Sequence, residues 1–263
     1  MSSFEEKVKK EILKSGLPSE IKVTNMLKKA GWTVINEYPY LDRDENKIRT
    51  LDLTAKRVFS KADNKDDSSK SGLACELYVE CKKSSKQSWV FFTEKLPQSY
   101  LIYSISRVFD DMLTNYGMPL IPPQPEVKNK KEYVNVFCKI PIAFNNLNYK
   151  IALSQQNVFS DKEEFYEGKM QVLKALRHKD EEDRTKTSET SAIVIPIIVF
   201  DGHIFECYYD DRGELSTPEI EYTRYLAHGL PNQRLPALID VVTLNYFPEY
   251  LKLIENEIQP ETK

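Results

Sequence analysis

The chain opens with two stretches of helical spacing. Apolar residues recur three and four positions apart among Glu and Lys, which predicts a surface helix over residues 4–14. Pro18 suits the first turn of a second helix, whose apolar stripe ends at Gly31. The chain is therefore expected to begin with two consecutive helices.

The following segment has the composition of β-strands. Residues 32–38 are β-branched and aromatic, and a polar turn at 42–47 separates them from a strand-like run at 48–55, which predicts an antiparallel hairpin. Residues 60–71 contain almost no apolar side chains, so we expect a mobile loop that leads to a third strand at 76–83. Together these runs predict a three-stranded meander.

A second set of elements follows further along the chain. Residues 162–178 have the spacing of an amphipathic helix, and the polar stretch 179–191 predicts another mobile loop that tolerates deletions. The most continuous apolar run, 192–200, predicts a central strand that is covered on both faces. Residues 201–202, Asp-Gly, predict a tight turn that returns the chain as a strand over 203–209.

These elements predict an α/β domain with a mixed β-sheet flanked by helices. Residues 235–258 add a strand-like piece and a terminal helix. No repeat of fixed period divides the chain, so its 263 residues are expected to form a single domain. Its expected parts are a core at about 18–92 and 162–208, an inserted side layer at about 93–150 and a C-terminal elaboration at 209–263.

Composition narrows the class of protein. A hydrophobic content of 41% can fill an ordinary core, and no apolar run approaches the roughly 20 residues that a membrane helix needs. The first residues lack the apolar stretch of a secretory signal, so we expect a cytoplasmic protein that does not enter a membrane. The cysteines form no CxxC pair, which favours buried free thiols over a structural zinc site. They are Cys75, Cys81, Cys138 and Cys207.

The charge balance indicates that any nucleic-acid surface is local. The net charge is -3 and the pI about 5.8, so no global positive field draws in nucleic acid. An enzyme of this composition that acts on nucleic acid would need a partner protein or a homo-oligomer to supply part of the positive charge that binds the phosphates. The sequence contains no glycine-rich nucleotide motif and no GxSxG motif, and its histidines lack the spacing of a histidine-metal nuclease.

Charged residues in the predicted meander indicate a site. Side chains two residues apart in a strand share a face, so Glu80 and Lys82 stand side by side. Asp52 lies between two leucines in the preceding strand. Glu20 continues the inward stripe of the second helix, an unusual place for a carboxylate unless a positive charge lies nearby. Alternatively, Glu20 only favours the positive end of the helix dipole.

These residues are suited to hold a divalent cation. Phosphodiester hydrolysis needs charge neutralisation at the phosphate and a deprotonated water, and carboxylate-held Mg²⁺ or Mn²⁺ supplies both. Asp52 and Glu80 fit as ligands, and the backbone carbonyl of Cys81 fits as a third. Lys82 would orient or deprotonate the water, or offset charge on the phosphorus. Glu20 would hold a metal-bound water or a second ion.

A simpler interpretation exists for part of this pattern. Glu-x-Lys on an exposed strand is commonly an ordinary charge pair. The order of the residues weighs against that interpretation here, because a helical Glu and a leucine-flanked Asp precede the pair. Three carboxylates at one place are strongly destabilising unless cations compensate them, so a metal accounts for the set more simply.

The residues Glu20, Asp52 and Glu80-Cys81-Lys82, carried by a helix and strands in this order, resemble the PD-(D/E)XK nuclease superfamily, also called restriction-endonuclease-like. The resemblance covers roughly residues 18–92 and, more loosely, 162–208. It implies a restriction-endonuclease-like core. On this likeness Glu20 would be the helical acidic residue that many members contain.

The same likeness assigns roles to the strand residues. Asp52 and Glu80 would be the metal carboxylates, and Lys82 would be the catalytic lysine. Leu51 stands where the family's name places proline, a position at which members often vary. Gln171, on the later helix, is similar to the polar residue that some members direct toward the site.

The resemblance implies a Mg²⁺-dependent nuclease with DNA as the expected substrate, and it suggests a role in bacterial or phage-related defence. The alternative, from another class, is a catalytically silent nucleic-acid- or protein-binding scaffold of the same fold, in which the charged residues form an ion-pair network. Metal binding distinguishes them, because Mg²⁺ or Mn²⁺ should raise the melting temperature of the nuclease only.

Overall fold

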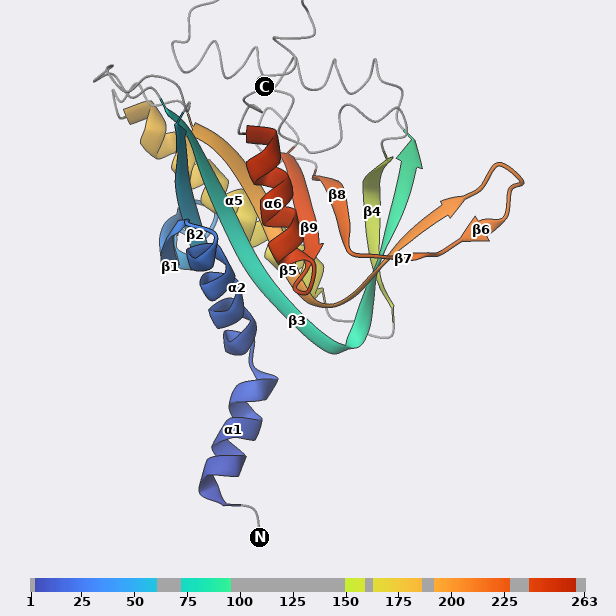
Figure 1. Ribbon diagram of the computed structural model, residues 1–263, viewed down its shortest axis with the longest axis horizontal. Coiled ribbons are helices and arrows are strands. Elements are labelled where there is room, and N and C mark those ends of the chain that lie inside the picture. Colours follow the sequence, from blue (N-terminus) through green and yellow to red (C-terminus); the bar gives the residue numbers. More distant parts are fainter. Residues whose placement is uncertain are drawn as a thin grey trace, which may run out of the picture.

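A mixed β-sheet with helices on both of its faces forms the described part of the chain (Figure 1). The computed structural model describes residues 3–60, 72–95, 150–158, 163–185, 192–227 and 237–258. Its helices are α1 (Phe4–Lys14), α2 (Leu17–Lys29), α5 (Glu164–Thr185) and α6 (Phe247–Ile258). Its strands are β1 (Thr33–Asp42), β2 (Lys47–Ser60), β3 (Gly72–Lys95), β4 (Lys150–Val158), β5 (Ala192–Tyr209), β6 (Leu215–Ser216), β7 (Glu219–Ile220), β8 (Tyr222–Ala227) and β9 (Ala237–Thr243). The prediction of an α/β fold with a mixed sheet is confirmed.

Antiparallel and parallel pairing both occur in this sheet. β1, β2 and β3 pair antiparallel in chain order, which confirms the predicted meander. β5 lies parallel to β3, and β9 lies parallel to β5 on its other side. The last residues of β3 also pair with β4, which leads on to β8. β3 is 24 residues long and therefore connects the meander with the rest of the sheet.

The two faces of the sheet carry separate apolar cores. On one face, Val199 of β5 lies in a cluster with Leu27 of α2 and Leu251 of α6. On the other face, Phe200 lies in a cluster with Leu173 of α5. Because successive side chains of a strand alternate faces, a strand covered on both sides must be apolar throughout. The predicted central strand is therefore confirmed.

The predicted turn at 201–202 and the hairpin after it are wrong. β5 continues through Gly202, and His203 pairs in parallel register with Ser88 of β3. A Cβ atom on Gly202 would lie 2.5 Å from the ring of Phe200 and 3.1 Å from the carbonyl oxygen of Ser84. The glycine therefore permits a close approach between neighbouring strands rather than a chain reversal.

The predicted polar loop at 179–191 is wrong over its first part. Residues 179–185 continue α5, and residues 186–191 lie outside the described residues, as does the predicted loop after Ser60. Lys179 lies 3.5 Å from Glu76 of β3, and Arg43 lies 2.7 Å from Glu181. These ion pairs give the polar end of α5 partners on the sheet and on the β1–β2 turn.

The second half of β3 lies in the sheet. Trp89 and Phe91 are fully buried, and the ring of Trp89 stacks on Phe200 at 3.7 Å between centroids. The expected side layer therefore begins no earlier than the end of β3. Residues 96–149 lie outside the described residues.

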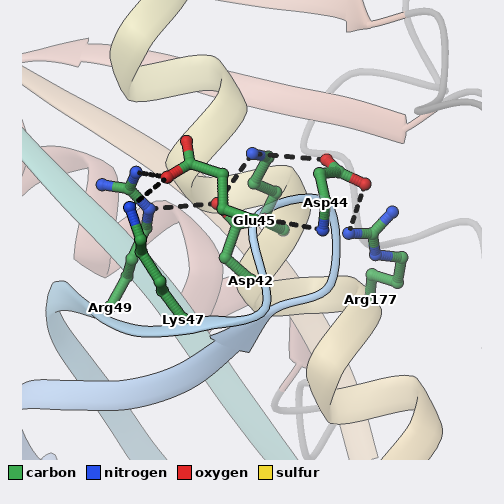
Figure 2. A network of polar contacts seen from close by, with 7 residues as sticks. Asp42, Asp44, Glu45, Lys47, Arg49 and Arg177 are labelled. Carbon is green, nitrogen blue, oxygen red and sulfur yellow. Dashed lines mark hydrogen bonds and ion pairs between the residues drawn. The ribbon is translucent and has the colours of Figure 1, made fainter.

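A network of ion pairs fixes α5 to the turn between β1 and β2 (Figure 2). Lys174 Nζ lies 2.8 Å from Asp42 Oδ2 and 3.3 Å from Asp44 Oδ2. Arg177 contacts Asp44 at 3.1 Å, and Arg49 contacts Asp42 at 3.0 Å. Burial acts to raise the pKa of Asp42, but hydrogen bonds from Lys174 and from the Asp44 amide outweigh it and hold that pKa below its ordinary value. The turn thus anchors the helix through ion pairs in which Asp42 is fully buried and Asp44 is about half exposed.

A second polar cluster lies inside the protein between β8, β9 and α6. Arg224 donates from Nε and Nη2 to the two carboxylate oxygens of Asp240, at 2.6 and 2.9 Å. The hydroxyl of Tyr250 donates to the same carboxylate at 2.6 Å. Arg224 and Asp240 are 3% and 2% exposed, so this is a buried, bidentate ion pair.

The helices and the cysteines bear on two predictions about the class of protein. In the part of the chain that the structure describes, no helix has both the length and the apolar character that crossing a membrane requires. Cys75, Cys81 and Cys207 are buried free thiols, as predicted, and Cys138 lies outside the described residues.

Candidate active site

Asp52 lies where β2 and β3 stop pairing. The β2–β3 register runs from Ser60–Gly72 to Leu53–Val79, and Asp52 is the next residue of β2. Its Oδ2 accepts a hydrogen bond of 2.7 Å from the backbone N–H of Cys81. The carboxylate therefore satisfies a β3 amide beyond the end of the ladder, and this bond fixes its position beside Glu80.

Glu80 and Lys82 project from β3 on one face, beneath α5. Lys82 Nζ lies 3.0 Å from Glu80 Oε1 and donates a hydrogen bond of 2.9 Å to Gln171 Oε1. Glu80 is 1% exposed, whereas the Lys82 side chain is 18% exposed. The structure thus brings Asp52, Glu80 and Lys82 together, with Gln171 holding the ammonium group from the helix.

Gly168 lets α5 approach these side chains closely. A Cβ atom at this position would lie 3.0 Å from Lys82 Cε and 3.6 Å from Glu80 Cγ. Gly168 precedes Gln171 by almost one helical turn, so both residues face β3. The sequence alone gave no reason to select this glycine, because a glycine inside a helix shows its contact only once the partner strand is known.

Burial is the main cause of the raised pKa values in this site. Burial, followed by the charge of Asp52, raises the pKa of Glu80 to about 8 against the opposing effect of Lys82. Burial also raises the pKa of Asp52, against the Cys81 N–H and the charge of Lys82. Without an added cation, burial therefore favours the protonated form of Glu80, and the ion pair with Lys82 opposes it.

Glu20 lies at the edge of the same site. It is in the first turn of α2 and is partly exposed. Burial raises its pKa above the ordinary value, the charges of Asp52 and Glu37 raise it further, and Lys82 lowers it. These electrostatic contacts place Glu20 among the strand residues that the sequence selected.

Glu37 is an acidic neighbour that the sequence did not reveal. In the β1–β2 register, Glu37 and Asp52 lie between the pairs Asn36–Leu53 and Tyr38–Leu51, and the charge of Glu37 raises the pKa of Glu20. Its φ of 52° lies in the left-handed region, which is uncommon for a residue with a side chain. A single unusual backbone conformation inside a strand leaves no periodic signal, so the alternation of β1 could not indicate it.

Two buried polar atoms, on Glu80 and Tyr40, lack a hydrogen-bond partner, and a divalent cation could satisfy one of them. The Oε2 atom of buried Glu80 and the hydroxyl of buried Tyr40 have no hydrogen-bond partner. Burial, followed by the charge of Glu80, raises the pKa of Tyr40 to about 12. A carboxylate oxygen left without a partner in the interior is destabilising, and a cation would satisfy it.

The described residues contain no ready-made set of three side-chain ligands. Among them, no three His, Cys, Asp or Glu side chains are arranged to hold a metal ion. Mg²⁺ is commonly held by one or two carboxylates and otherwise by water and substrate oxygens. Asp52 and Glu80 fit this pattern, and the backbone carbonyl of Cys81 as a third ligand stays a prediction.

The histidines have partners elsewhere. His203 lies 2.5 Å from Glu219 across the β5–β7 pair, and His178 lies 3.6 Å from Glu182 one turn along α5. His228 lies outside the described residues. In the described part of the chain, the chemistry of the site is therefore that of carboxylates and a lysine.

The raised pKa of Glu80 predicts that stability falls with pH. Between pH 4.5 and about 8 the unfolded chain releases this proton while the folded protein keeps it. The unfolded state then binds fewer protons, so the unfolding free energy should fall by about 1.4 kcal/mol per pH unit from this group. Urea denaturation at several pH values, without divalent cations, measures the slope. Glu80→Gln should flatten it, and equal slopes for both proteins would contradict the assignment.

Comparisons with known proteins give no match. No family model, no curated protein and no solved structure matches this chain. Its function is therefore inferred from the residues of the site and their geometry.

Proposed function

We propose that this chain is a Mg²⁺-dependent nuclease that hydrolyses phosphodiester bonds, with DNA as the expected substrate. The observation that carries the proposal is buried Glu80, which has one oxygen on Lys82 and the other without a partner, next to Asp52. Structural ion pairs usually satisfy both oxygens of a buried carboxylate. The likeness of this set to the PD-(D/E)XK superfamily supports the same reaction, and with it a role in bacterial or phage-related defence.

Each residue has a distinct task in this reaction. Asp52 and Glu80 would hold Mg²⁺, which supplies charge neutralisation at the phosphate and acidifies a bound water. Lys82 lies beside this position and would orient the water or offset charge on the phosphorus. Gln171 accepts a hydrogen bond from Lys82 and limits the directions in which its ammonium group can point.

Leu51, which stands where the name of the similar family places proline, is compatible with this proposal. Leu51 is fully buried in the core that α5 covers, whereas Leu53 lies in the core of the opposite face. Asp52 stands between them at the point where β2 leaves β3. The two leucines therefore anchor β2 on both sides of the carboxylate.

One observation favours the scaffold alternative. Lys82 already has two partners, Glu80 and Gln171, so the pair can be stable as a structural contact without a cation. A scaffold of this kind would keep Glu80 protonated or paired at all times. The two functions therefore differ in whether a divalent cation competes with the proton on Glu80.

Cleavage and metal binding should be measured together. The full chain is incubated with linear, circular and single-stranded DNA and with RNA, each with Mg²⁺, with Mn²⁺ and with EDTA. We expect cleavage that depends on the cation, and a melting temperature that rises with its concentration. Asp52→Asn should abolish both effects, because it removes one metal carboxylate with little change of shape. A protein that neither cleaves nor responds to Mg²⁺ would be the scaffold.

Gly168→Ala tests the geometry around Lys82. The added methyl group would meet Lys82 Cε at 3.0 Å, so the lysine must shift and lose its fixed contact with Gln171. Alanine also favours the helix by about 1 kcal/mol, so the stability should change little. We expect slower cleavage at nearly constant melting temperature. Glu167→Ala, at an exposed position of the same helix, is the matched control and should cleave at the wild-type rate.

A further inference from the structure

α1 extends away from the sheet (Figure 1). It exposes an apolar stripe. Phe4, Val8 and Ile12 are 83%, 40% and 46% exposed. They are four residues apart and therefore follow one side of the helix. Large apolar side chains aligned in this way on a protruding element indicate a surface that another surface covers.

The helix is well formed at its start and fixed at its end. Ser3 and Glu6 form a reciprocal capping box at its N-terminus. Near its C-terminus, Lys83 of β3 donates a hydrogen bond of 2.9 Å to the carbonyl of Leu13. A helix of 11 residues is marginal by itself in water, so packing of its apolar face is needed for it to persist.

We propose that α1 pairs with α1 of a second copy of this chain, in antiparallel orientation, about a twofold axis near Val8. In this arrangement Phe4 of each copy faces Ile12 of the other, and the two Val8 side chains meet at the axis. This interaction surface is independent of the proposed reaction.

The charges beside the stripe select a second copy in this orientation. On one flank, Glu5 is followed one turn later by Lys9, and on the other flank Lys7 is followed by Glu11. In an antiparallel pair, the same flank of each helix lies next to that flank of the other, and the two run in opposite directions. Glu5 of each copy then lies beside Lys9 of the other, and Lys7 lies beside Glu11. Each flank is therefore complementary to itself.

The position of α1 also permits this pairing. The body of the protein lies at the C-terminal end of α1, while the N-terminal end points away from it (Figure 1). An antiparallel pair places the two bodies at opposite ends of a helix pair about 16 Å long. A contact between two single short helices is smaller than the roughly 1,200 Å² of stable complexes, so the dimer should be weak and should depend on concentration.

Sedimentation velocity of the full chain between about 1 and 200 µM tests the surface. The wild type should pass from monomer to dimer within this range of concentrations, because the contact is small. Val8→Asp should remain monomeric, whereas Lys10→Asp, on the opposite side of α1, should dimerise as the wild type does. The melting temperatures of both variants show whether the body stays folded.

Charge exchange identifies the occupant. Glu5→Lys alone and Lys9→Glu alone should each be monomeric, because like charges then meet across the axis. An equimolar mixture of the two variants should dimerise. Positions 5 and 9 are then both basic in one chain and both acidic in the other, so they attract each other across the axis. A wild-type chain that stays monomeric at about 200 µM overturns the proposal, and another protein or another segment of this chain would then cover the stripe. A dimer that survives Val8→Asp, or a mixture that stays monomeric, also overturns it.

Discussion

Lys82→Ala should lower DNA cleavage by about 100-fold or more while Mg²⁺ binding survives. Lys82 lies 3.0 Å from Glu80 and is held by Gln171, so it stands beside the carboxylates that we propose as metal ligands and would not itself bind the metal. Asp52→Ala should lose both cleavage and metal binding. Single-turnover cleavage rates, together with Mg²⁺ titrations followed by melting temperature, separate the two effects.

The stability of Lys82→Ala needs its own measurement. Removing the cation from a buried pair can cost about 3–5 kcal/mol, because the remaining charge has no partner. Glu80 is 1% exposed, but its raised pKa allows it to become protonated instead, which reduces this loss. Gln171→Ala, which leaves the pair intact, should lower cleavage less. A folded Lys82→Ala that cleaves as fast as the wild type would make Lys82 an ordinary strand lysine and favour the scaffold.

Asp240→Ala should lower the unfolding free energy by about 3–5 kcal/mol. It removes the carboxylate that holds both Arg224 and Tyr250 in the interior, and it leaves a 3% exposed guanidinium without its bidentate partner. Chemical denaturation measures this loss, and cleavage by the remaining folded fraction should be unchanged, because β9 carries no residue of the proposed site.

Two further variants separate burial from charge. Lys252→Ala breaks an ion pair with Glu249 on the surface of α6, where both side chains are more than half exposed, and should change stability by less than about 1 kcal/mol. Replacing both members of the buried pair, as Arg224→Met with Asp240→Leu, should cost less than Asp240→Ala alone, because no charge then lacks a partner. Equal losses for all three would show that burial of this pair has no special effect.

The sequence predicted those elements whose signals are local. The meander and both terminal helices follow from periodicity, and the side-by-side arrangement of Glu80 and Lys82 follows from strand alternation. For Glu20 the sequence left two interpretations open, and the inward stripe of α2 is the one that brings it near the strands. Each of these predictions depends on spacing within one element, which the chain alone determines.

Features that depend on two distant segments were missed. The pair Asp201-Gly202 is typical of a turn, but β5 continues through it, and only a residue without a Cβ atom fits beside Phe200 and Ser84. Gly168 matters only because Lys82 lies beneath it. The short strands β6, β7 and β8 have no clear alternation, and each depends on pairing with a longer strand, β5 or β9.

β3 cannot complete its central pairing until the ribosome has made β5. Ala74 pairs with Ala192, roughly 120 residues later, and translation at about 5–20 residues per second takes about 6–24 s to cover that length. During this interval the nascent chain presents the apolar, unpaired edge of a long strand. Such non-local pairing is slow to form, so a newly made chain is expected to need protection from aggregation until β5 arrives.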